Sequence, residues 1–212
     1  MKRILLIIAL VASVCSVKAQ DITPLFTAMP DSFMPQLETA WRKDLVDLFK
    51  SGKLAKLENS MSGHSELKAL TGDYVHLQAT AASEVQLKLL PLVNNTYIIC
   101  MINTVSGPVK DSRISFYTTE WKPLDSKSLF TPPALEQFIA KGIDPKTPTS
   151  QAALAPVDVL LLEYRLNASN LQLEAVFTTP QYVSKEQREA LKKVINETPV
   201  VYKWGNSHFE LL

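Results

Sequence analysis

The sequence predicts an α+β protein: an antiparallel sheet of about eight strands in hairpins, with helices packed on one face. From residue 74 onward, several segments alternate apolar and polar side chains with a period of two, as strands with one buried face do. These segments come in pairs separated by short turns, which is typical of hairpins. Other segments repeat apolar residues at three- and four-residue steps, as amphipathic helices do.

The first long helix is expected after residue 36 and ends at Gly52, because glycine commonly follows a helix C-terminus. Its apolar stripe consists of Leu37, Trp41, Leu45, Leu48 and Phe49. Residues 21–35 contain three prolines, so we expect only a short turn of helix or an extended lead-in there. Residues 65–70 are expected to form a second short helix.

Two hairpins follow. Residues 74–80 and 84–90 alternate strictly and are expected to pair. Residues 97–104 are almost all apolar, which indicates a central strand, and residues 112–121 are its expected partner.

The connection at residues 105–111 could be mistaken for a catalytic loop. Gly107 supplies backbone freedom, Pro108 restricts φ, and the Asp111 side chain can bond its own downstream amide. A structural bend explains each of these residues, and the alternative is a loop that contacts a ligand.

In the second half, residues 157–166 with 170–179, and 199–204 with 207–212, form two more expected hairpins. A short helix is expected over residues 132–141.

The helix over residues 184–195 has the clearest start, because Ser184 and Gln187 form a capping box.

Residues 144–156, rich in Pro, Thr, Ser and Ala, are either a surface loop of a single domain, residues 20–212, or a linker between two sub-halves. Residues 76–92 and 162–178 each hold a hairpin whose second strand opens with Gln-Leu. This weak echo leaves a duplicated half as an alternative.

The N-terminus predicts export. Lys2 and Arg3 give a short basic start, and residues 4–14 are uncharged, mainly apolar and too short to span a membrane comfortably. Val17 and Ala19 suit a signal-peptidase site, so residues 1–19 are the expected signal peptide. The mature protein would lie in the periplasm or outside the cell. A lipoprotein anchor on Cys15 is disfavoured, because Val14 stands where a small residue is expected.

The composition of the mature chain argues against several classes of protein. Removal of Lys2, Arg3 and Lys18 leaves 19 basic residues against 21 acidic ones, a formal charge of −2. This balance gives no electrostatic case for nucleic acid as a partner. No later segment is apolar for long enough to span a membrane. Cys100 is the only mature cysteine, so an intramolecular disulfide is impossible, and we expect Cys100 in the core.

No cofactor or metal is expected. Phosphate-binding glycine motifs are absent from the sequence, and His64, His76 and His208 lack the spacing of metal ligands. Asp44 and Asp47 share a helix face and could work as acid and base. Because Arg42 and Lys43 lie in the same turns, a solvated face is the simpler interpretation.

Polar and aromatic side chains on two strands suggest a contact surface. Tyr74, His76 and Gln78 line one face of the first strand, and Arg113 and Tyr117 line one face of another. If these strands are neighbours, the side chains would form a platform for a peptide, a glycan or an envelope protein.

The chain resembles a family of uncharacterised exported proteins of Bacteroidetes, known only as a domain of unknown function. The similarity covers most of the mature chain and is weakest beyond residue 147. It rests on MPDSFMPQL (29–37), Arg42-x-Asp44-x-x-Asp47, GHSELKALTGDYVHLQAT (63–80), LKLLPL (87–92) and NTVSGPVKDSRISFYTTEW (103–121). The resemblance implies secretion into a Gram-negative envelope and no particular activity.

The sequence therefore favours an exported envelope protein that is a non-enzymatic binding or assembly module. The alternative is a hydrolase or other enzyme that uses acids such as Asp44, Asp47 and Asp111.

Overall fold

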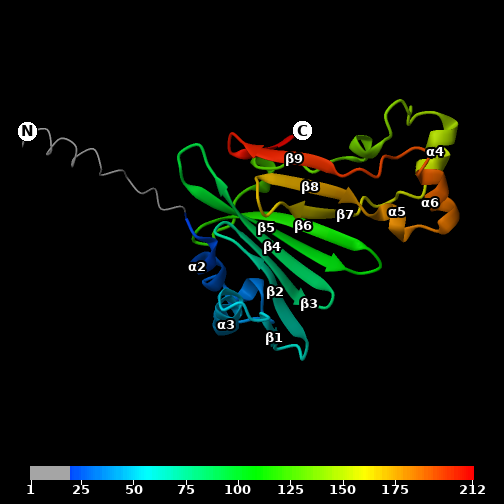
Figure 1. Cartoon of the computed structure of the whole chain (residues 1–212). Coiled ribbons are helices and arrows are strands. Elements are labelled where there is room, and N and C mark those ends of the chain that lie inside the picture. Colours follow the sequence, from blue (N-terminus) through cyan, green and yellow to red (C-terminus); the bar gives the residue numbers. More distant parts are fainter. Residues whose placement is uncertain (1–19) are drawn as a thin grey trace, which may run out of the picture.

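The computed structural model describes residues 20–212 and contains two antiparallel sheets (Figure 1). In both, each strand pairs with the next one along the chain. The six-stranded sheet comprises β1 (Lys56–Glu58), β2 (His64–Leu70), β3 (Tyr74–Thr80), β4 (Ser83–Pro91), β5 (Tyr97–Ser106) and β6 (Lys110–Thr118). The four-stranded sheet comprises β7 (Leu162–Leu166), β8 (Gln172–Phe177), β9 (Val200–Gly205) and β10 (His208–Leu211).

The helices are short except for one. The α-helices are α2 (Ile22–Thr27), α3 (Thr39–Lys50), α4 (Pro148–Leu154), α5 (Thr179–Tyr182) and α6 (Lys185–Leu191). Three 3₁₀ turns add η1 (Asp31–Phe33), η2 (Ser126–Ser128) and η3 (Leu135–Phe138). Among residues 20–212, no helix has the length and apolar character needed to cross a membrane.

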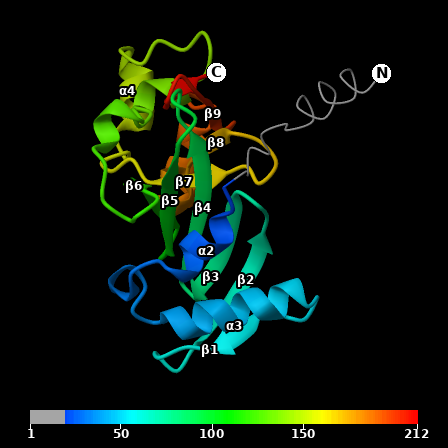
Figure 2. The same cartoon turned by 90° about the vertical axis from the view of Figure 1, so that its left-hand side faces the viewer.

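The six-stranded sheet separates two apolar cores. On one face, Val75, Leu87 and Met101 pack with residues of α2 and α3, and α3 runs across β1 and β2 (Figure 2). On the other face, Cys100 and Phe116 belong to a core shared with the four-stranded sheet. β4 and β5 are therefore buried on both sides, which explains why residues 97–104 are almost entirely apolar.

The expected α+β class is confirmed, but the strands within residues 20–212 number ten and form two sheets. The helix layer on one face of the larger sheet agrees with the sequence, whereas a second sheet covering the other face was not expected. All four expected hairpins form.

Residues 65–70 form strand β2, so the expected short helix there is wrong. Ser65 and Leu67 are buried while Lys68 is exposed, an alternation that a six-residue segment cannot distinguish from a helical stripe. Pairing with β3 on one side, interrupted by a register shift at Lys68, and with β1 on the other supplies backbone hydrogen bonds, and this tertiary context outweighs local helix propensity.

Helix boundaries differ from expectation at three places. The short helix expected over residues 132–141 is only the 3₁₀ turn η3, Leu135–Phe138. Residues 144–156 contain α4, which begins at Pro148 with the Thr147 hydroxyl accepting from the Ser150 amide at 3.2 Å. The segment is therefore neither a bare linker nor a bare loop. The capping box of Ser184 and Gln187 is confirmed, but α6 ends at Leu191.

Side chains of the six-stranded sheet accept hydrogen bonds from backbone amides of β7, the edge strand of the four-stranded sheet. The amide of Leu162 donates to Asp111 Oδ1 at 3.2 Å, and the amide of Leu166 donates to Gln86 Oε1 at 2.9 Å. These bonds pair buried backbone groups at the β7 edge that would otherwise be costly to desolvate. Asp111 thus helps to join the sheets, and no bond to its own downstream amide is found.

Arg42 ties the N-terminal segment to α3. Its side chain is fully buried and donates to the carbonyl oxygens of Leu37 (2.6 Å), Met29 and Thr27, as well as to Asp31 Oδ1 at 3.0 Å. The expectation that Arg42 belongs to a solvated helix face is therefore wrong.

Candidate functional site

The residues proposed as one contact platform lie on opposite faces of the six-stranded sheet. β4 and β5 separate β3 from β6. Tyr74, His76 and Gln78 lie on the β3 face that turns toward the four-stranded sheet. Arg113 and Tyr117 lie on the opposite face of β6, where Tyr117 packs beside the helix layer. The shared platform therefore does not form.

Three of these side chains have internal partners. The Tyr74 hydroxyl donates to Gln86 Oε1 at 3.3 Å, and burial raises the pKa of Tyr74 to about 12. Gln78 donates to the carbonyl oxygens of Thr80 and Ser83, which closes the β3–β4 turn. The ring of Tyr117 lies 5.0 Å from that of Phe33, and the two rings are tilted by 54°. Arg113 is exposed.

His76 belongs to an ion cluster between the two sheets. Its Nε2 lies 2.8 Å from Glu84 Oε2, and Lys110 Nζ donates to Glu84 at 2.5 Å and to Glu163 at 2.9 Å. Arg165 completes the cluster at 2.5 Å from Glu163. Burial alone would raise the pKa of Glu84, but hydrogen bonds from Lys110 and His76 hold that pKa below its usual range. The arrangement joins strands of both sheets and lines neither pocket described below.

The three acids named for an enzymatic alternative do not converge: Asp44 and Asp47 lie together on α3, whereas Asp111 lies on β6. Asp44 and Asp47 are exposed on α3 beside a shallow hollow that no histidine lines, whereas Asp111 bonds β7. Within residues 20–212, no three His, Cys, Asp or Glu side chains are grouped so that they could hold a metal ion. Cys100 is fully buried as expected, and burial raises the pKa of its thiol.

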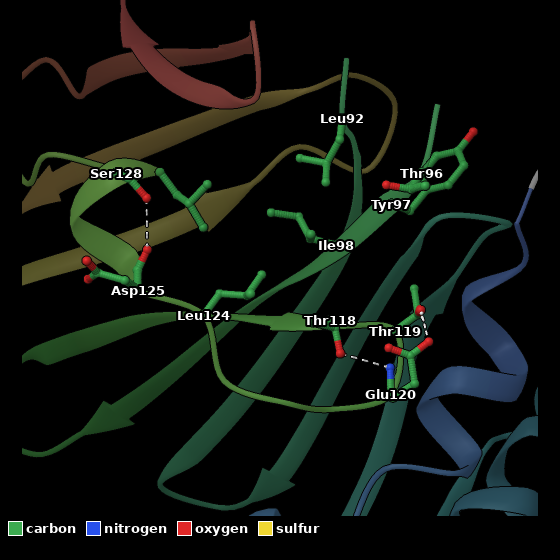
Figure 3. Close-up of a pocket in the computed structure, with 11 residues that line it drawn as sticks. Leu92, Thr96, Tyr97, Ile98, Thr118, Thr119, Glu120, Leu124, Asp125 and Ser128 are labelled. Atoms are coloured by element: carbon green, nitrogen blue, oxygen red, sulfur yellow. Dashed lines mark hydrogen bonds between the residues drawn. The ribbon is translucent and has the colours of Figure 1, made fainter. Parts of the chain in front are cut away.

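A pocket of about 490 Å³ lies where the β4–β5 hairpin meets the segment that follows β6 (Figure 3). Leu92, Ile98 and Leu124 point into a common space, and we call this space the apolar pocket. Its full lining is Leu92, Thr96, Tyr97, Ile98, Thr118, Thr119, Glu120, Leu124, Asp125, Ser128 and Leu129.

Two tight turns shape the walls of the apolar pocket. The Leu92 amide donates to the Thr96 carbonyl, and Asn95 between them has φ of +62°. On the other wall, Trp121 also has φ of +62°, an unusual value for a bulky residue. The Thr118 hydroxyl accepts from the amides of Glu120 at 3.2 Å and Lys122 at 3.3 Å, which closes this second turn.

Trp121 anchors the second turn against the helix layer. Its indole Nε1 donates to the Leu25 carbonyl at 3.0 Å, and its ring lies 5.6 Å from that of Tyr117 and 5.8 Å from that of Phe33. The Trp121 side chain therefore packs against the helix layer and does not line the apolar pocket. It fixes the backbone that carries Thr119 and Glu120.

The apolar pocket has a floor of apolar side chains and negatively charged side chains at its rim. Glu120 and Asp125 line it, but no Lys, Arg or His does. A hydrogen bond from the Thr119 hydroxyl lowers the pKa of Glu120. Lys122 lies within electrostatic range of Glu120 without lining the pocket. Such a site suits an apolar group that stands next to a positive charge.

Sequence reasoning did not find this pocket, because its walls come from three segments: 92–98, 118–120 and 124–129. Residues 118–120 were expected only as part of the strand over residues 112–121.

Comparison with known proteins gives a family and a fold relative. Residues 14–209 match a family described as a protein of unknown function, DUF3256. A solved structure of a domain of an uncharacterized protein from Porphyromonas gingivalis W83 is 29% identical, with a TM-score of 0.81. The alignment covers 90% of this chain and 98% of that one. No curated protein matches the chain. The match over nearly the whole length identifies the chain as a member of the DUF3256 family.

Proposed function

We propose that the mature chain is a non-enzymatic binding module of the bacterial envelope and that the apolar pocket receives part of a partner protein. The observation that carries this proposal is the apolar pocket itself, with leucine and isoleucine side chains on its floor and two carboxylates on its rim. Its volume of about 490 Å³ is of the size that ligand sites commonly have.

The chemistry of the lining favours a peptide segment with an apolar side chain next to a basic one. The apolar pocket can bury an apolar side chain, which contributes about 1.5–3 kcal/mol when fully buried. Glu120 and Asp125 would attract a neighbouring lysine or arginine, and this contribution weakens as salt increases.

The proposal is tested with random twelve-residue peptides displayed on phage and selected on the immobilised chain of residues 20–212. We expect enrichment of peptides in which Leu, Ile, Met or Phe stands within two residues of Lys or Arg. Leu124→Ser should weaken binding of a selected peptide at least tenfold, because burial of an apolar side chain loses its partner. Thr119→Trp, which fills the pocket, should weaken it similarly.

Glu189→Gln on the exposed face of α6 is the matched control and should leave affinity unchanged. Unfolding midpoints of all variants establish that they remain folded at the assay temperature. If neither Leu124→Ser nor Thr119→Trp changes the affinity of the selected peptides, the proposal is contradicted.

We also propose that the chain is exported and cut before Gln20. The basic start, the uncharged segment and the Val17 and Ala19 positions support this, and all of them lie outside the described residues. Intact-mass measurement on protein recovered from an envelope fraction should give a chain that begins at Gln20. A lipid-modified chain that begins at Cys15 would favour the lipoprotein alternative instead.

A further inference from the structure

A second pocket, of about 690 Å³, lies beside the apolar pocket. Three segments far apart in sequence form most of it: residues 20–21, 71–73 and 168–171. Its remaining lining residues are Leu89, Pro91 and Tyr97.

The two pockets adjoin each other where strands β4 and β5 enter the turn that connects them. Tyr97 lines both of them. Pro91, the cross-strand partner of Tyr97, lines the second pocket, and the adjacent Leu92 lines the apolar pocket. An extended peptide advances about 3.3 Å per residue, so a few residues are enough to pass from one pocket to the other over Tyr97.

The lining of the second pocket has the same sign of charge as the apolar pocket. It contains Asp21 and Asp73 but no Lys, Arg or His. Asp73 is paired at 2.8 Å with Lys88, which is 1% exposed and also donates to the Ala168 carbonyl at 3.0 Å, so Asp21 is the lining carboxylate whose charge is not compensated in this way. Asp21 is exposed and uses its Oδ1 to cap α2 through the Thr23 amide at 2.9 Å.

Polar groups suited to a peptide backbone lie on the opposite wall. Ser169 and Asn170 are exposed at the tip of the β7–β8 hairpin, and both amides are held by Asn167 Oδ1. Their hydroxyl and amide groups can donate to carbonyl oxygens of a chain that lies in the pocket.

We infer that the partner segment is an extended basic peptide that runs over Tyr97 and places a second cationic side chain in the second pocket. This inference rests on the proposed function of the apolar pocket. It defines the ligand further: one apolar residue with an adjacent cation, separated by a few residues from another cation near Asp21. Carboxylates in both linings and the shared tyrosine carry it.

The test uses two synthetic peptides with a fluorescent label, measured by anisotropy. The long peptide, KKGSGLKGSG, has a Lys-Lys pair four residues before its Leu-Lys pair; the short peptide, GSGLKGSG, lacks the first pair. The protein is the chain that begins at Gln20, as the proposed cleavage leaves it. We expect the long peptide to bind about three- to tenfold more tightly than the short one.

Two variants separate the pockets. Asp21→Asn keeps the helix cap, because asparagine also caps helices, but removes the charge. Asn170→Lys adds a positive charge on the opposite wall. Both should lower the affinity of the long peptide to that of the short one and leave the short peptide unchanged. Asp47→Asn, on the exposed face of α3, is the matched control.

The results discriminate among the possibilities. Equal affinity of both peptides, together with loss of binding in Leu124→Ser, would overturn the inference and leave the proposed function intact. Absence of binding by either peptide would count against both. Binding of maltoheptaose more tightly than the long peptide, with loss in Asp21→Asn, would assign the second pocket to a glycan and overturn the inference.

Discussion

Replacement of Arg42 by methionine should lower the free energy of unfolding by about 3–5 kcal/mol, the range expected when one member of a buried charged network is removed. The guanidinium is fully buried and donates to three main-chain carbonyls, those of Leu37, Met29 and Thr27. Methionine fills similar space but donates nothing, so these carbonyls lose their partner. Chemical unfolding monitored by fluorescence measures the change.

One feature of Arg42 opposes this loss, but it is smaller. Its Nε is buried without a hydrogen-bond partner in the described chain, so methionine removes one unsatisfied donor, which offsets about 1–3 kcal/mol at most. Several lost bonds, including the one to Asp31, outweigh that gain. Lys43→Met, at the neighbouring exposed position, is the control and should change stability by no more than about 0.5 kcal/mol. A fully stable Arg42→Met protein would show that the network does not hold the N-terminal segment.

Replacement of Trp121 by alanine should cost about 3–5 kcal/mol, as expected for a large buried aromatic side chain. The indole is 6% exposed, packs against Phe33 and Tyr117, and donates to the Leu25 carbonyl. Its loss leaves a cavity between the helix layer and the turn that bounds the apolar pocket. Peptide binding at that pocket should weaken in parallel, because Thr119 and Glu120 lose the anchor of their backbone.

The left-handed backbone of Trp121 allows a second comparison. Alanine at this position keeps the strain of a φ of +62°, whereas glycine adopts it freely. Trp121→Gly should therefore be more stable than Trp121→Ala by about 1 kcal/mol, since the left-handed conformation costs other residues about 1–2 kcal/mol. Tyr182→Ala, at an aromatic side chain 59% exposed, should be nearly neutral. A glycine variant less stable than the alanine variant would argue against the left-handed turn.

The sequence predicts most of the strands correctly, because alternation is a local property of each segment. The expected strand over residues 74–80 coincides with β3, and that over 97–104 lies within β5. The expected start of the helix predicted over residues 184–195 is also correct, since Ser184 and Gln187 satisfy its first amides locally. The prediction of a helix over residues 65–70 was wrong because the strand there depends on pairing with β3 and not on a local pattern.

The candidate site could not be predicted in the same way. The apolar pocket needs Leu92, Leu124 and Leu129 to meet, and no spacing rule connects a hairpin tip with a segment some thirty residues later. The predicted contact platform does not form. Alternation shows which side chains of one strand lie on the same face, but it does not show whether the polar faces of two distant strands lie on the same side of the sheet. Tyr74 and Tyr117 each lie on a polar-aromatic stripe, yet the pairing order puts them on opposite faces.

The sequence by itself determined the α+β class, the hairpin order and the cap of α6, because each depends on residues within a few positions of one another. Only the tertiary structure decided that the strands divide into two sheets, that Arg42 is buried and that two acid-lined pockets meet at Tyr97. These features arise from burial of apolar faces against partners far away in the chain, and which partner a face meets is a property of the whole packed core.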